Sequence, residues 1–150
     1  MKEIYYTYNN EAIATCIMIQ VLQEVQSIDI ARSCLILPFL LDDRTVNYLQ
    51  TVKNDELSLG NFIQFRPRFF TSFNKRFTTL LPITINALMI LSKSNQIDIS
   101  KDISLRKNIL PDNIEIGDRF NEIKKALPVL MKMIARHETA QLYQLLKIQL

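Results

Sequence analysis

The sequence has no tryptophan, a single histidine, two cysteines and only two glycines. Proteins built from tight β-hairpins use many glycines, because the turns need positive φ angles. The scarcity of glycine therefore disfavours an all-β fold and favours helices. Two cysteines without histidine or cysteine neighbours at ligand spacing provide no metal site. We expect Cys16 and Cys34 to be buried free thiols of a protein in a reducing compartment.

Long apolar segments are also absent. The longest, residues 34–41, has eight residues and includes a proline, whereas a membrane-spanning helix needs about 20. The N-terminal residues 1–4 show no charged region followed by an apolar one, so we expect no signal peptide. The net charge of +3 is too small to indicate a nucleic-acid partner by itself. Together these features predict a cytoplasmic protein without a membrane partner.

The sequence does contain enough apolar material for one folded domain. Its 150 residues are 48% hydrophobic and 22% charged, unlike the composition of disordered chains. A chain of this length buries about 70% of its unfolded surface and needs no metal or disulfide to fold. No repeat, linker or low-complexity segment divides it. We predict a single domain over residues 1–150, mainly α with a short β-sheet or hairpin.

The N-terminal third predicts a strand and then helices. Residues 4–8 are aromatic and β-branched, which indicates a short strand. Asn9 or Asn10 then offers an N-cap for a helix to about residue 26, and this helix is apolar nearly all round, as buried helices are.

The next segment leaves two alternatives open. Residues 34–41 form either a buried strand or a core helix broken by proline, because periodicity does not distinguish them. Asp42 or Asp43 is expected to cap a helix that runs to about Val52. A polar connection follows around Gly60.

An aromatic segment between residues 62 and 77 holds six of the eight phenylalanines. Their spacings of three and four indicate a helical stripe, with Pro67 separating two helices. Pro82 fits the first position of a further helix. We therefore predict separate helices over residues 71–81 and 83–94. The six phenylalanines are Phe62, Phe65, Phe69, Phe70, Phe73 and Phe77.

Residues 97–105 alternate apolar and polar side chains, the pattern of a β-hairpin. Ile97, Ile99, Ile103 and Leu105 are expected on one buried face, with Asp98 and Lys101 toward water. A helix pair followed by a hairpin is the layout of a winged helix, so a second interpretation is a winged-helix DNA-binding regulator. The second helix of the pair has no Arg or Lys before Lys93, which disfavours base reading and favours protein docking.

The C-terminal third predicts helices and a final strand. Pro111 to Asn113 starts a new segment, and a long helix over residues 116–134 is expected to kink or split at Pro128. Thr139 is expected to cap a last helical turn. Residues 146–150 alternate as a strand does.

Four basic residues lie within the aromatic segment with no acidic residue among them: Arg66, Arg68, Lys75 and Arg76. Basic residues contact phosphates and phenylalanines stack on bases, so these four are candidate nucleic-acid contacts. The plainer interpretation, which we favour, is that the phenylalanines are core and the cations are their solvated face.

Catalytic signatures are absent from the sequence, since no phosphate loop, zinc-protease motif or nucleophile elbow occurs. His137 lies in a polar stretch and is expected to be a solvated residue at a helix end. Asp42 and Asp43 are neighbours whose side chains point apart, which suits capping better than acid–base chemistry. We expect no enzyme activity and no cofactor.

Several stretches, in order along the chain, resemble the middle components of bacterial three-component ABC systems, the group that includes Lamassu anti-phage defence. The stretches are Asn9–Ala12 opening an apolar helix, Leu37–Leu41 leading to Arg44, Thr45 and Leu49, Arg76-Phe77 ahead of Thr84–Leu88, and the ending Leu142–Ile148. The tail departs from the family pattern, which has an aromatic stretch, often with tryptophan, before the last turn.

The resemblance implies a small accessory subunit without catalytic residues. Its partners would be an SMC-like or Rad50-like ATPase and an effector, commonly a nuclease. The middle component would bridge the two in an anti-phage defence complex and hold the effector inactive until the ATPase engages foreign DNA. The mean hydropathy of +0.05 suits a subunit that keeps an apolar patch for a partner.

Overall fold

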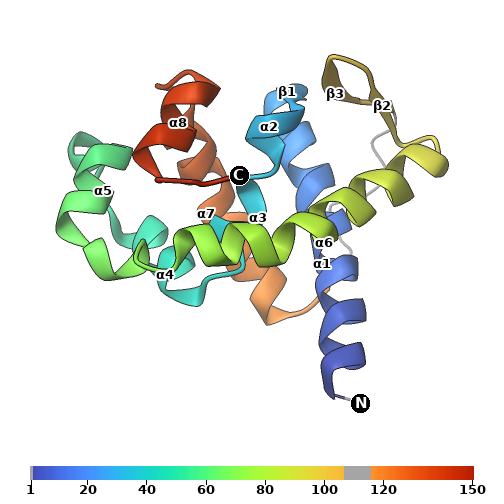
Figure 1. Ribbon diagram of the computed structural model, residues 1–150, viewed down its shortest axis with the longest axis horizontal. Helices are drawn as coiled ribbons and strands as arrows, with labels where there is room; N and C mark the ends of the chain where they lie inside the picture. Colours follow the sequence, from blue (N-terminus) through green and yellow to red (C-terminus); the bar gives the residue numbers. More distant parts are fainter. Residues whose placement is uncertain (1, 107–115) are drawn as a thin grey trace.

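The computed structural model describes the backbone of residues 2–106 and 116–150, and their side chains from residue 11 onward. The fold is mainly helical, with a small antiparallel sheet at one side (Figure 1). Three helices are long: α1 (Lys2–Val25), α6 (Phe73–Lys93) and α7 (Asp118–Ile134). The shorter ones are α2 (Ile30–Ser33), α3 (Ile36–Leu40), α4 (Asp43–Thr51), α5 (Leu59–Phe65) and α8 (Thr139–Leu145). The predicted fold class is confirmed.

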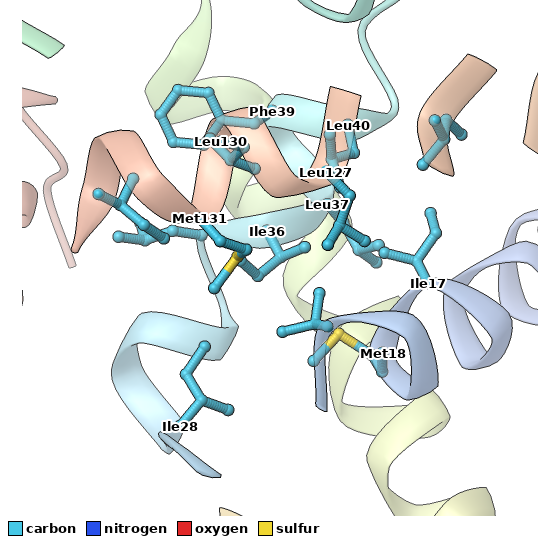
Figure 2. Close-up of a cluster of buried hydrophobic side chains, with 14 of the residues drawn as sticks. Ile17, Met18, Ile28, Ile36, Leu37, Phe39, Leu40, Leu127, Leu130 and Met131 are labelled. Carbon is cyan, nitrogen blue, oxygen red and sulfur yellow. The ribbon is translucent and has the colours of Figure 1, made fainter. Parts of the chain in front are cut away.

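The centre of the fold is α3, whose five side chains are all buried. This short helix contacts α4, α6 and α7, and Figure 2 shows its apolar side chains between Ile17 and Met18 of α1 and Leu127, Leu130 and Met131 of α7. Pro38 is its third residue, where a backbone N–H would have no partner within the helix. The proline therefore costs no hydrogen bond. Of the two alternatives for residues 34–41, the core helix is correct.

The predicted N-terminal strand is wrong. Residues 4–8 lie inside α1, and Asn9 and Asn10 are interior helical positions rather than caps. Strand preference is a weak local bias, whereas the later turns of α1 bury a continuous apolar side against α6 and α7. Helix propagation adds one hydrogen bond per residue, so the helix continues back through the preceding residues. In Figure 1 its first turns extend beyond the rest of the fold.

The predicted end of a helix at Pro82 is wrong, and of the two alternatives at Pro128, a kink or a split, the split is wrong. Residues 73–93 form one helix with Pro82 inside it, and α7 continues through Pro128. The prediction of separate helices over 71–81 and 83–94 fails, and with it the helix pair of the winged-helix comparison. An internal proline costs about 3 kcal/mol. Packing of α6 along α1 and of α7 against α1 and α4 compensates for that loss.

The end of α6 was correctly placed near Ser94 and Asn95. Asn95 adopts a left-handed conformation (φ 60°), one that asparagine tolerates better than most residues. The Gln96 N–H donates to the Leu91 carbonyl (2.9 Å) and the Asn95 N–H to the Ser92 carbonyl (3.1 Å). These two bonds form a Schellman motif, which satisfies carbonyls at the helix end.

The hairpin is confirmed as β2 (Ile97–Ile99) and β3 (Asp102–Leu105). A third strand, β1 (Ser27–Asp29), pairs with β3, giving the order β1-β3-β2. Ile97 and Ile103 are buried, Leu105 is partly buried, and Asp98 and Lys101 face water as expected. Ile99 is the exception at 38% exposure. It is the last residue of β2, an outer strand of the sheet, and lies beside the turn to β3.

Between the long helices, the local predictions largely hold. Asp42 is the N-cap of α4, and its carboxylate accepts from the Thr45 hydroxyl (2.7 Å). A short 3₁₀ turn over Pro67–Phe69 separates α5 from α6, as predicted from Pro67. Another 3₁₀ turn spans Asn54–Glu56. The predicted segment start at Pro111 to Asn113 lies outside the described residues.

A polar cluster fixes α8 to the β1–α2 corner. The Thr139 hydroxyl donates to Asp29 (2.6 Å) and accepts from Arg32 Nε (3.0 Å). The Arg32 guanidinium also donates to the Ile134 carbonyl (3.1 Å) and to the His137 carbonyl. The prediction that Thr139 caps this helix is wrong. Thr139 is the first residue of α8, and the N-cap is Glu138, which forms a capping box with Gln141.

The predicted C-terminal strand is wrong as well. After α8 the chain makes a turn in which Lys147 has a positive φ (55°). The Gln149 N–H then donates to the Asn74 side chain of α6 (2.8 Å). An alternating pattern of five residues forms a strand only if it pairs with another strand, and in the described structure the sheet has no strand beyond β1, β2 and β3.

No helix in the described part of the chain has both the length and the apolar character that crossing a membrane requires.

Replacing Phe73 should severely destabilise the fold. Its side chain is fully buried, and its ring centre lies 4.8 Å from that of Phe39 and 5.9 Å from that of Phe70. We expect Phe73→Ala to lower the free energy of unfolding by about 3–5 kcal/mol. The matched control is Phe65→Ala, since Phe65 is 53% exposed, and it should cost about 0.5 kcal/mol or less. Urea denaturation of both variants measures the free energy of unfolding. If Phe65→Ala lowered it as much as Phe73→Ala does, the assignment of Phe73 to the core would be contradicted.

Tyr143 should make the fold sensitive to alkali. Its hydroxyl donates to the Ala31 carbonyl (2.6 Å), and burial raises the pKa of the phenol well above its usual value near 10. Above pH 10 the unfolded chain releases a proton that the folded chain retains, so stability falls as pH rises.

We therefore expect the advantage of wild type over Tyr143→Phe, about 1 kcal/mol at pH 8, to shrink between pH 9 and 11. Urea denaturation of both proteins across this range measures the difference between their free energies of unfolding. All other titrating groups are the same in the two proteins, so their contributions cancel. A pH-independent difference would contradict this role of the phenol.

Candidate interaction surface

The second half of α6 exposes an apolar face. Ile85, Met89 and Ile90 are 49%, 48% and 48% exposed. Ile85 and Met89 are four residues apart and therefore adjacent on the helix surface. The opposite side of the same turns buries Ala87, Leu88 and Leu91 in the core. This part of α6 is apolar on two sides, and among the residues that the structure describes only one of them is covered.

The position of this face is fixed by contacts with α1. Asn86 lies between Ile85 and Met89 along the helix, and its amide donates to the Glu11 carboxylate of α1 (3.1 Å). The buried side chains of α6 pack on the apolar side of α1, as the crossing of the two helices shows (Figure 1). The exposed side chains are therefore held on a rigid element, which lowers the entropy cost of docking. We call Ile85, Met89 and Ile90 the apolar face of α6.

Sequence reasoning missed this face. It predicted a separate helix over residues 83–94 and singled out no exposed apolar side chains on it. The available signal was that residues 83–91 contain only two polar side chains. A surface helix normally has a wide polar side, so an excess of apolar residues beyond one stripe indicates either full burial or a partner.

The phenylalanines of the basic aromatic segment are mostly core, as the favoured interpretation held. Phe62, Phe73 and Phe77 are buried, and Phe69 and Phe70 are partly buried. Phe62 stacks on Tyr48 of α4, with ring centres 4.1 Å apart. Phe62, Phe73 and Phe77 therefore offer no ring face to a nucleic-acid base. Phe65 alone among the six is exposed.

The four basic residues of that segment do not share one role. Arg66 and Arg68 are exposed at the turn between α5 and α6, and Lys75 is exposed on the first turn of α6. The Arg66 guanidinium lies 5.8 Å from the Tyr48 ring centre and donates to the adjacent Phe65 carbonyl (3.0 Å).

Arg76 is instead built into the fold, so the expectation of a solvated cation is wrong for it. Its Nε donates to the Pro38 carbonyl (3.2 Å) and its two terminal nitrogens to Ser72 Oγ and the Phe69 carbonyl (both 3.0 Å). The guanidinium also lies 5.1 Å from the Phe73 ring centre. Burial lowers the pKa of Arg76 from its ordinary value. Arg76 joins the end of α3 to the start of α6.

The other polar candidates have structural roles in the described residues. His137 is partly buried, and its backbone carbonyl accepts from Arg32. Cys34 is buried and Cys16 partly so, and burial raises the pKa of both thiols. Across residues 11–106 and 116–150, no three His, Cys, Asp or Glu side chains lie close enough to hold a metal ion.

Arg76 and Arg68 form a matched pair for testing these roles. Arg76→Met should lower the free energy of unfolding by about 1–3 kcal/mol, because it leaves partly buried oxygens of the Pro38 and Phe69 carbonyls without donors. Arg68→Met should stay within about 0.5 kcal/mol, because the Arg68 side chain is exposed and makes no such contact. Chemical denaturation measures both, and similar small effects would refute the anchoring role of Arg76.

Comparison with known proteins gives one match. The family model described as ABC-three component (ABC-3C) system Middle Component 3 matches residues 1–150, the whole chain. No curated protein and no solved structure gives a significant match.

Proposed function

We propose that this chain, which belongs to the Middle Component 3 family of ABC-three component systems, is a non-enzymatic subunit that binds other components of its system. The apolar face of α6 carries this proposal. A middle component implies interaction with the other two components, and this face offers a surface for it. Burial of apolar area in an interface contributes about 25 cal/mol per Å². Ile85 and Met89, which are adjacent, supply such area together with the exposed Ile90.

The charge distribution around the face suits a protein partner better than a nucleic acid. Across the 12 residues from Pro82 to Lys93, Lys93 is the only charged residue, and the one carboxylate bonded to these turns in the described structure is Glu11 of α1, through Asn86. Protein interfaces have apolar centres depleted in charge, whereas DNA-reading helices present several polar or basic groups to a groove. The winged-helix regulator is therefore the weaker reading.

We further propose the partners that the sequence resemblance implies. These are an SMC-like or Rad50-like ATPase and an effector nuclease of a Lamassu-type anti-phage system, working in the bacterial cytoplasm. The subunit would bridge them and restrain the effector. DNA would reach the subunit only through the assembled complex. Support for this finer assignment comes from the resemblance alone.

The apolar face is tested by placing charge on it. Ile85→Glu with Met89→Glu should weaken binding to the other components at least a hundredfold, because two carboxylates would be desolvated in the interface. The fold should be retained, since both positions are about half exposed. Co-expression with the other components, followed by size-exclusion chromatography and titration, measures the affinity.

A matched control adds the same two charges elsewhere, at Gln64→Glu and Thr78→Glu, both exposed positions. The control should bind as wild type does. If the face variant also binds like wild type, the apolar face of α6 is not the docking surface. If wild type itself ignores both components, the adaptor function is refuted.

A further inference from the structure

A pocket of about 390 Å³ opens between the first turns of α6, the end of α3 and the first turn of α7. Three cationic side chains line it: Lys75, Arg76 and Arg119. Leu41 and Leu80 supply an apolar wall, and no acidic residue of the described chain belongs to the lining. This basic pocket lies at the opposite end of α6 from the apolar face.

The cations of the pocket lack full compensation. All three hydrogen bonds of the Arg76 guanidinium go to neutral oxygens, and in the described part of the chain no carboxylate lies within ion-pair distance of it. Lys75 is exposed on the rim. Arg119 has only a long ion pair with Asp43 (3.8 Å), a carboxylate that is itself 81% exposed. A half-buried guanidinium facing neutral oxygens favours an anion nearby, because the attraction is stronger where water is partly excluded.

The neighbouring carboxylates of Asp42 and Asp43 do not neutralise the cations of the pocket. The Asp42 side chain is 13% exposed and is already used by the Thr45 hydroxyl (2.7 Å) and Arg44 Nε (3.3 Å). Asp43 projects into solvent beside the pocket. Arg119 directs another nitrogen to the Leu41 carbonyl (3.3 Å), so its guanidinium is held at the pocket wall with donors to spare.

The lining indicates which kind of anion fits. A nucleic-acid backbone presents a row of phosphates and would gain nothing from the two leucines of the wall. A single carboxylate with an apolar neighbour matches the lining: the carboxylate accepts from Lys75 and Arg119, and the apolar group lies against Leu41 and Leu80. Ser72 and Thr79 add hydroxyl groups to the same wall.

We propose that the basic pocket binds an acidic side chain, flanked by an apolar residue, from a protein component of the same system. This inference rests on the proposed function that the chain docks on those components. It assigns to the first turns of α6 a second contact, polar and charge-selective, that complements the apolar face. Charge complementarity of this kind contributes to partner selection and to the rate of association.

The test uses the full chain with the other components co-expressed. Lys75→Glu with Arg119→Glu should lower affinity at least tenfold and should flatten the salt dependence, because wild-type binding through ion pairs weakens with added salt. The control, Lys53→Glu with Lys101→Glu, changes net charge equally at exposed positions outside the pocket and should bind as wild type does. Arg76 is left intact because the fold requires it. If the double variant unfolds at a lower temperature than wild type, Lys75→Gln replaces it in the test, because it removes one positive charge of the pocket and breaks no contact of the described structure.

The outcomes separate the two proposals. If the apolar-face variant loses binding while the pocket variants keep wild-type affinity and salt dependence, the function stands and the acidic ligand is refuted. If wild type binds the components and neither surface affects the affinity, the apolar face and the pocket are both refuted as contacts; the function itself is refuted only if wild type binds no component. Equal losses in the pocket and control variants would show a general charge effect and also overturn the pocket. Weaker binding of a 20-base-pair DNA duplex by the assembled complex, with unchanged protein affinity, would assign the pocket to nucleic acid instead.

Discussion

The structure depends on the complete burial of α3. Five apolar residues cannot form a stable helix alone, so this helix exists only because longer helices surround it. Burial also creates a demand, because its terminal carbonyls must find donors away from water. Arg76 and Arg119 meet part of that demand at the Pro38 and Leu41 carbonyls. Two cations are thereby brought together at one place, and the same requirement that completes the core creates the basic pocket.

Sequence reasoning succeeded where a signal was local and reinforced by packing, and it failed where tertiary contacts overrode it. The hairpin at 97–105 and the end of α6 at Asn95 were predictable because turn-forming residues and alternation agree there. Residues 4–8 have strand preference but belong to a helix whose later turns are buried. Pro82 and Pro128 would end isolated helices, yet long neighbours hold α6 and α7 together. Strand β1, Ser27–Asp29, was not predicted, because three residues with one apolar side chain are too few to show an alternating pattern.

The candidate site was predictable only in part. The aromatic segment was correctly interpreted as core, but Arg76 could not be distinguished from Arg68 without knowing that the Pro38 carbonyl lies beside it. Arg119 lies 43 residues after Arg76 in the sequence, and only folding brings the two side chains together.

The long helix α6 therefore carries two different surfaces, the basic pocket near its start and the apolar face near its end. From Lys75 to Met89 is about 21 Å along α6 at 1.5 Å per residue, far enough for two partners, or two parts of one partner, to bind side by side.

The polar cluster at Asp29, Arg32 and Thr139 has a consequence for synthesis on the ribosome. Asp29 and Thr139 are 110 positions apart, and β1 also waits for β3, so the contact order of this corner is high and its closure is slow. During translation the β1–α2 corner emerges early, but its contact with Thr139 forms only when the chain is nearly finished. The apolar side of α1 that precedes it stays uncovered until α6 has been made. A nascent chain in this state is prone to aggregate, so shielding by a chaperone or by a subunit made at the same time would raise the yield of folded protein.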